Sequence, residues 1–157
     1  MKKEEKTNVM RVLEQKKVPY ESHSYTPDAT LTGEEIAGIL GEDPNHVFKT
    51  LVTRGKTGQY YVFVVPVAED LDLKKAAKAS GEKSIEMIRQ KELLPLTGYV
   101  HGGCSPIGMK KTFATFIHES AVELTRMYVS AGKVGFQVEL SPQDLAKTVG
   151  CGFADLV

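Results

Sequence analysis

The spacing of hydrophobic residues predicts five helices, most of which carry a recognisable start or end. Val9, Val12 and Leu13 fall on one face of a helix that Thr7 can cap. Further helix starts are marked by a capping box at residues 32–35, by Asp72 and by Ser141. The helices are expected at residues 8–16, 33–40, 73–80, 88–94 and 142–148, with a short helical turn from Pro44 and an end before Pro95.

Runs of β-branched and aromatic residues predict six strands. They are expected at residues 20–25, 46–53, 59–67, 113–118, 127–130 and 135–140. Gly55 and Gly58 split the second run from the third, which indicates a hairpin, and residues 60–65 are apolar at every position, which favours a central strand. We therefore expect a mixed α/β domain with a largely antiparallel, barrel-like sheet, because the βαβ repetition of a doubly wound fold is missing.

Length and composition indicate a single domain over residues 1–157. There are 20 basic and 20 acidic residues, a balance that excludes a chain whose whole surface attracts nucleic acid. There is no run of about 18 apolar residues for a membrane span, and the charged segment 1–6 precedes no apolar signal core. The two cysteines form no CxxC pair, which favours a reducing cytoplasm. The histidines lack the spacing of metal ligands, so we expect no metal or other cofactor.

Lys49 and a glycine-rich segment are the first candidates for chemistry. Lys49 interrupts an apolar strand, so it either points to solvent or faces a cavity where it could bind an anion or a carbonyl. Residues 102–108 contain three glycines, which form either a tight turn or a loop whose amides approach a ligand. Within that loop Cys104 beside Ser105 suggests a nucleophile, but a base is needed and no histidine can be assigned to that role, so a packed thiol is the alternative.

Charge is segregated along the chain although its sum is zero. Residues 20–48 contain six acids and no lysine or arginine, whereas residues 71–91 contain six basic residues against three acids. Lys74, Lys75 and Lys78 share one expected helix, and Lys110 and Lys111 follow the glycine-rich segment. These lysines form either a solvated face or a patch that follows the phosphates of a nucleic acid.

Five motifs in order resemble the YbaK/EbsC group, the free-standing relatives of the editing domain of bacterial prolyl-tRNA synthetases. The similarity extends from about residue 8 to residue 156. The motifs are Phe48-Lys49-Thr50, Leu73-Lys74-Lys75-Ala76-Ala77, Gly102-Gly103-Cys104-Ser105-Pro106-Ile107-Gly108, Tyr128-Val129-Ser130-Ala131-Gly132-Lys133 and Ser141-Pro142-Gln143-Asp144-Leu145. The resemblance implies the group's fold, a mixed barrel-like sheet surrounded by helices. Cys104 and Ala131 stand where the group varies, and no role is attached to them.

The resemblance also implies an activity and a set of site residues. The activity is hydrolysis of mischarged aminoacyl-tRNA, here cysteine on the proline tRNA, with tRNA as the substrate and prolyl-tRNA synthetase as a candidate partner. Lys49 matches the essential lysine and Gly102 the glycine whose backbone approaches the scissile ester. The resemblance places Tyr25, Thr50 and Ser130 in the substrate pocket, and Gly103, Ser105 and Pro106 of the glycine-rich motif are added as substrate-binding residues. The charge pattern assigns tRNA binding to Lys74, Lys75, Lys78, Lys110 and Lys111.

In that group the substrate thiol is thought to attack its own ester, with release of a thiolactone as a lyase-type variant. Such a pocket needs positioning and oxyanion stabilisation rather than a protein nucleophile. Three alternatives stay open: a deacylase of alanine or another small residue that uses water, a non-catalytic tRNA- or synthetase-binding module, and a hydrolase that uses Cys104.

Overall fold

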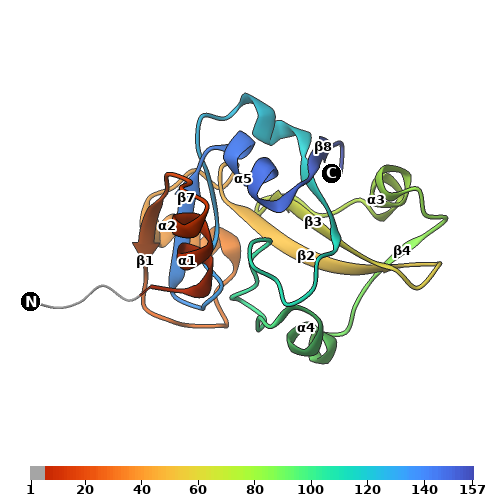
Figure 1. The fold of residues 1–157 in the computed structure, drawn as a ribbon, viewed down its shortest axis with the longest axis horizontal. Helices are drawn as coiled ribbons and strands as arrows, with labels where there is room; N and C mark the ends of the chain where they lie inside the picture. The colour runs from red at the N-terminus through yellow and green to blue at the C-terminus, as the bar shows by residue number, and fades with distance from the viewer. Residues whose placement is uncertain (1–5) are drawn as a thin grey trace, which may run out of the picture.

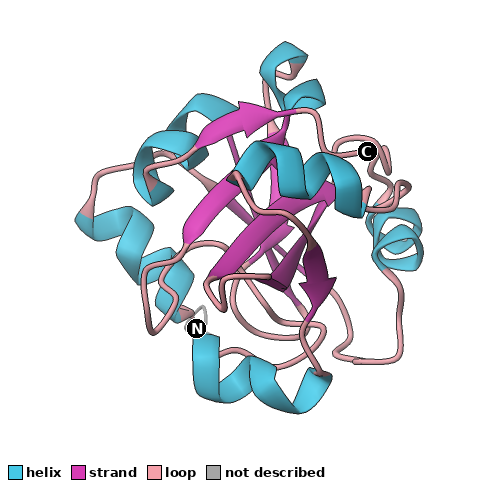
Figure 2. Cartoon of the chain, turned by 90° about the vertical axis from the view of Figure 1, so that its right-hand side faces the viewer, coloured by secondary structure: helices cyan, strands magenta, loops and turns pink. Residues whose placement is uncertain are grey.

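The computed structural model describes residues 6–157 and consists of helices arranged around two β-sheets (Figures 1 and 2). In chain order the elements are α1 (Asn8–Gln15), β1 (Glu21–Ser24), α2 (Gly33–Leu40), β2 (Phe48–Gly55), β3 (Tyr60–Pro66), α3 (Leu73–Ser80), β4 (Ile85–Met87), α4 (Gln90–Thr97), β5 (Ala114–His118), the 3₁₀ helix η1 (Glu119–Glu123), β6 (Met127–Ser130), β7 (Phe136–Leu140), α5 (Pro142–Val149) and β8 (Gly152–Ala154). The charged residues 1–5 lie outside the described part. Within residues 6–157, no helix has the length and apolar character that crossing a bilayer requires.

The strands form two separate sheets rather than a closed barrel. Strands β1-β7-β6 make an antiparallel three-stranded sheet, and β4-β2-β3-β5-β8 make a mixed five-stranded sheet. In the five-stranded sheet β2 pairs with β3 and β4 antiparallel, while β5 lies parallel to β3 and to β8. A single bridge between Val47 and Tyr128 connects the two sheets within the described chain. The mixed α/β class is confirmed, and the barrel-like closure is not observed.

The main hydrophobic core lies between the two sheets. Phe48, Val52 and Val62 of the larger sheet and Val129 and Val138 of the smaller one belong to one buried cluster, to which α1 and α5 contribute. Strand β3 has its whole length after Tyr60 buried, as expected for a central strand. The opposite face of the larger sheet carries a second cluster, covered by α3 and the C-terminal Leu156.

The predicted helix starts are confirmed because capping depends on neighbours in sequence. The Thr7 and Ser141 hydroxyls each accept a hydrogen bond from the first turn of their helix, and the Asp72 carboxylate accepts two. Thr32 and Glu35 form the reciprocal capping box at α2. Gly41 ends α2 in the left-handed region at φ 68°, where glycine carries no Cβ penalty.

The structure differs from the sequence-based expectation at one turn, in helix α4, in the unpredicted 3₁₀ helix η1 and in two short strands. Residues 44–46 form a turn instead of a short helix. Helix α4 runs from Gln90 through Pro95 to Thr97, since a proline in a helix of eight residues removes only one intrahelical hydrogen bond. Strands β4 and β8, three residues each, were not predicted. They occupy the sheet edges and are too short to show the alternation of apolar and polar residues that marks a strand.

Candidate functional site

A cavity of about 560 Å³ opens beside the N-terminal end of β2. Its walls come from the segment leading into α2, from the first residues of β2, from the loop after β3, from the glycine-rich loop and from the β6–β7 pair. The lining residues are Tyr25, residues 29–34, Ile36, residues 47–51, Val67, Ala68, Asp70, Leu93, His101, Gly102, Cys104, Ser130, Phe136 and Gln137. The cavity therefore lies next to the Val47–Tyr128 bridge, where the two sheets are connected.

Lys49 lines this cavity from the second position of β2. Backbone pairing with Val65 of the buried strand β3 fixes its position, and its side chain is about one third exposed (33%). The ammonium lies 3.8 Å from the carboxylate of Asp70, which is fully exposed. Such an exposed pair is worth little energetically, so the charge of Lys49 is available to a ligand.

Two polar oxygen atoms at the cavity are buried without a hydrogen-bond partner. One is Oγ1 of Thr50, beside Lys49, and the other is Oε1 of Gln137 on β7, a residue with only 4% of its surface exposed. Buried polar atoms are nearly always hydrogen-bonded in proteins. Both residues line the cavity, but the two oxygens are closed off from solvent, so a ligand could bond to them only after neighbouring side chains move.

The small sheet supplies the opposite wall. The Tyr25 N–H donates to the Gly135 carbonyl at 2.9 Å, which extends the β1–β7 pairing by one residue. Ser130 ends β6, and its hydroxyl accepts from the Gly132 N–H at 3.2 Å. Tyr25 and Ser130, predicted from distant parts of the chain, thus meet Lys49 and Thr50 at one cavity.

Part of the glycine-rich loop lines the cavity, and part of it is buried in the protein interior. Gly102 lines the cavity with φ 86°, a left-handed conformation that favours glycine, and His101 lies beside it. The Gly103 N–H donates to the Val100 carbonyl, and a Cβ at Gly103 would lie 3.0 Å from the Val134 nitrogen, so this residue is packed inside the loop.

Two further loop residues that were predicted to bind substrate do not line this cavity. Ser105 has no exposed surface, and its hydroxyl accepts from the Ile107 N–H at 3.3 Å. Pro106 is buried and lines a different cleft. Gly103, Ser105 and Pro106 are therefore not placed to contact an aminoacyl group in this cavity, although Cys104 between them lines it.

The sequence of this chain is similar to that of a known family and of a known protein. A family model described as "Aminoacyl-tRNA editing domain" matches residues 26–148. The chain is 46% identical over 156 residues to the protein named "Putative Cys-tRNA(Pro)/Cys-tRNA(Cys) deacylase EbsC" of Enterococcus faecalis, covering 99% of this chain and 95% of that protein. The chain belongs to the aminoacyl-tRNA editing family.

Two further proteins are similar to this chain, one in sequence and one in structure. A proline–tRNA ligase of Thermosipho melanesiensis is 25% identical over 108 residues, which are 69% of this chain and 18% of the ligase. A solved structure described as a "putative trans-editing enzyme for prolyl tRNA synthetase" superposes with a TM-score of 0.82 at 26% identity, covering 94% of this chain and 93% of the other. The resemblance recognised in the sequence is confirmed, and the editing fold covers nearly the whole chain.

Behind the cavity of this editing domain lies a network of charged side chains. The His23 ring and the Arg126 guanidinium both contact the Glu139 carboxylate, at 2.8 and 3.2 Å. Burial raises the pKa of Glu139, but the hydrogen bonds from His23 and Arg126 outweigh it and lower that pKa. Glu21, His23 and Glu139 also present ligand atoms within 4.8 Å of one another, yet a metal ion there would compete with the Arg126 cation already bound to Glu139.

Glu42 connects this network to the cavity wall. Burial raises the pKa of Glu42, and a hydrogen bond from the Gln137 side chain opposes the increase. One oxygen of this carboxylate, Oε1, is buried without a partner. Glu42 therefore orients the Gln137 amide at the cost of desolvating a carboxylate.

We expect Glu42→Gln to stabilise the protein near neutral pH. A carboxyl group whose pKa is raised by folding favours the native state only while it is protonated, so stability declines as pH rises from the ordinary pKa of about 4.3 through the raised value. Glutamine keeps an acceptor for Gln137 without the ionisation. Melting temperatures measured from about pH 4 to pH 8 should be higher and flatter for this variant than for the parent chain. Glu86→Gln, on the exposed edge strand β4, is the control, and a Glu42→Gln protein less stable than the parent at pH 7 would contradict the explanation.

Cys104 lines the cavity but is poorly suited to attack an ester. Burial raises the pKa of its thiol to about 12, and a hydrogen bond with Thr97 opposes this only in part. The thiolate is the reactive form, so almost none is present at neutral pH. Burial likewise raises the pKa of Cys151 to about 11.

Cys104→Ala should therefore retain most of the deacylation activity. Turnover by the parent and variant proteins, matched for melting temperature, measures this directly. A complete loss of activity in a folded variant would instead assign the nucleophile to Cys104.

The lysines predicted to bind tRNA fall into two groups. On α3, Lys74 and Lys78 are exposed, whereas Lys75 donates to the Asp155 carboxylate and to the C-terminal Val157 carbonyl. The charge of Lys75 is thus already paired within the chain, which argues against a role in tRNA binding. Of the other group, Lys111 is exposed and lines the same cleft as Pro106, and Lys110 precedes it in the same loop.

Sequence reasoning missed several residues of the site. Asp70, Gln137 and the segment 29–36 reach the cavity only through the tertiary fold. Gln137 did leave a signal, because it is a polar residue between Phe136 and Val138 in a short strand. Its burial and its unpartnered oxygen could not be foreseen from that pattern.

Proposed function

We propose that this protein hydrolyses the ester bond of mischarged aminoacyl-tRNA, with cysteine on the proline tRNA as its principal substrate. Membership of the editing family supports the reaction class, and the 46% identical EbsC relative, whose name refers to Cys-tRNA(Pro) and Cys-tRNA(Cys), supports the substrate. The single observation that carries the proposal is the convergence of Lys49, Thr50, Gly102, Tyr25 and Ser130 on one cavity.

In this proposal Lys49 and the glycine-rich loop act on the ester. The ammonium stabilises negative charge that develops on the carbonyl oxygen or binds the terminal adenosine, and the Gly102 backbone amide approaches the same oxygen. Tyr25, Thr50 and Ser130 hold the aminoacyl group. Once neighbouring side chains move to uncover it, the buried oxygen of Gln137 accepts a hydrogen bond from the substrate, and the α-ammonium group of the amino acid is the donor that suits it.

The cleavage step uses the thiol of the substrate. The cysteine sulfur attacks its own ester carbon, a C–S bond forms as the C–O bond to the ribose breaks, and the thiol proton passes to the ribose oxygen. Water then opens the resulting thiolactone to free cysteine, so the net reaction is hydrolysis. This route needs orientation rather than a protein nucleophile, in keeping with the high pKa of Cys104.

The partners follow from the reaction. Aminoacylated tRNA is the substrate, and prolyl-tRNA synthetase is the proposed source of tRNA selectivity, since a domain of 157 residues contacts little of a tRNA by itself. A deacylation assay on proline tRNA charged with cysteine, alanine, serine or proline tests the proposal. Cysteine should be released fastest; faster release of alanine would identify a water-using deacylase of small residues, and release of none would indicate a binding module.

A further inference from the structure

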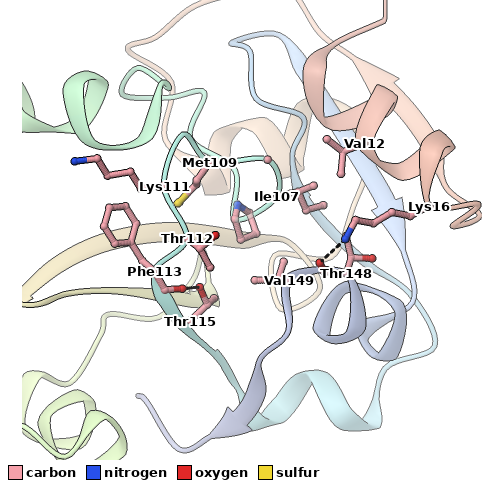
Figure 3. Close-up of a pocket in the computed structure, with 12 residues that line it drawn as sticks. Val12, Lys16, Ile107, Met109, Lys111, Thr112, Phe113, Thr115, Thr148 and Val149 are labelled. Atoms are coloured by element: carbon pink, nitrogen blue, oxygen red, sulfur yellow. Dashed lines mark hydrogen bonds between the residues drawn. The ribbon is translucent and has the colours of Figure 1, made fainter.

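A second cleft, of about 200 Å³, lies on the other side of the glycine-rich loop (Figure 3). Gly102 and Cys104 line the large cavity, whereas Pro106, Ile107 and Gly108 line this cleft. Residues two positions apart have Cα atoms at most about 7 Å from each other, so the two sites are adjacent. One continuous loop therefore connects the reaction site to the cleft.

The rims of the cleft are basic. Lys16, just after α1, and Lys111, after the glycine-rich loop, stand on opposite sides in Figure 3, where the Lys111 side chain extends outward from the cleft. Lys16 Nζ lies 3.5 Å from the Thr148 carbonyl, which draws its ammonium toward the cleft. None of the described residues that line the cleft is acidic. The site is thus complementary to negative charge.

The floor of the cleft is suited to a flat ring. It combines apolar side chains, among them Met109 and Val149, with threonines, and the Phe113 ring stands at one side (Figure 3). Ile107 beneath them is almost fully buried. Phe113 is held by an edge-to-face contact with Tyr60, at a centroid distance of 5.8 Å. The volume is below the roughly 300–1,000 Å³ of pockets that enclose a whole small ligand. A single base between phosphates fits this combination of a small, partly apolar floor and cationic rims.

We infer that this cleft binds the single-stranded RNA that leads to the esterified terminal nucleotide, with a base against Phe113 and phosphates at Lys16 and Lys111. The inference rests on the proposed function, because it takes the RNA strand of that substrate as the occupant. Aromatic rings and lysines are the groups that bind single strands without reading their sequence. The cleft, rather than the α3 lysines alone, then positions the ester at Lys49.

Two substrates distinguish an effect on RNA binding in the cleft from an effect on the reaction site. Cysteinyl-tRNA(Pro) extends into the cleft, whereas 3′-O-cysteinyl-adenosine carries the ester without the preceding nucleotides. In the double variant Lys16→Glu, Lys111→Glu, the ratio of kcat/KM for the tRNA to kcat/KM for the adenosine ester should fall by about tenfold or more, since charge-assisted contacts to phosphate are strong. The double reversal Lys56→Glu, Lys83→Glu, at two exposed lysines that line neither cavity, is the charge-matched control, and Phe113→Leu tests the ring without reversing charge.

RNA binding is measured independently of hydrolysis, by fluorescence anisotropy of a labelled uncharged single strand that ends in the tRNA acceptor sequence. The double variant should weaken binding and reduce the salt slope, by about 0.7 for each phosphate that is no longer bound. A Lys16→Glu, Lys111→Glu protein that binds RNA with the affinity and salt slope of the Lys56→Glu, Lys83→Glu control would overturn the inference. If the parent protein hydrolyses neither ester, the proposed function fails, while the anisotropy result still decides whether the cleft binds RNA.

Discussion

Lys49→Ala is expected to lower the rate of Cys-tRNA(Pro) deacylation by about 10²–10³-fold, the usual effect of removing one electrostatic contact to a developing oxyanion. The prediction follows from the position of Lys49. Its backbone is fixed in β2 against the buried strand β3, while its ammonium lines the cavity and meets the exposed Asp70 at 3.8 Å. An ion pair this long and this exposed competes weakly with the substrate for the charge of Lys49.

Two further variants test whether the shape and the position of the cation on β2 matter for the rate. Lys49→Arg should also be defective, because a planar guanidinium cannot replace a compact ammonium in a confined site. Arg54→Ala removes an exposed cation from the same strand and should leave the rate unchanged. Single-turnover rates at saturating protein measure the chemical step for each variant. A Lys49→Ala protein with nearly the parental rate would exclude Lys49 from the chemistry and leave the glycine-rich loop as the principal stabilising element.

Replacement of the substrate thiol by a hydroxyl should have an effect of comparable size. Well-oriented intramolecular nucleophiles reach effective molarities of about 10⁵–10⁸ M, so we expect Ser-tRNA(Pro) to be hydrolysed at least about 100-fold more slowly than Cys-tRNA(Pro). Serine has nearly the shape of cysteine and the same α-ammonium group, so the two substrates differ chiefly in the nucleophile. The comparison therefore tests the cleavage route rather than binding.

The competing route predicts a different result. A protein that activates water would treat the two esters alike, and equal rates for Ser-tRNA(Pro) and Cys-tRNA(Pro) would contradict attack by the substrate thiol. Cys104→Ala provides the internal control, because a buried thiol with a pKa of about 12 should not substitute for the missing substrate thiol.

Local signals in the sequence predicted most of the elements, and tertiary contacts determined the rest of the fold. The capping box of Thr32 and Glu35 places the start of α2 because both partners belong to one helical turn. Pro95 misled the prediction of α4, since a short helix can include a proline when its other contacts are kept. Whether the sheet closes depends on how β6 and β2 meet, and a single bridge at Val47 is not encoded in any local pattern.

The site was predictable where one residue broke a pattern. Lys49 stands out in an apolar strand, and Gly102 in a cluster of glycines. By contrast, Ser105 lies in the same cluster but turns into the interior, because its hydroxyl is used by the Ile107 N–H. The direction in which a loop side chain points depends on such hydrogen bonds, which a one-dimensional pattern does not reveal.

The most direct test of the central claim is the release of free cysteine from Cys-tRNA(Pro) by the purified protein, followed in time against the same substrate in buffer. We expect release well above the spontaneous rate with the parent chain and near the spontaneous rate with Lys49→Ala. Release by the parent chain no faster than in buffer, under conditions where the protein is folded and the tRNA intact, would contradict it.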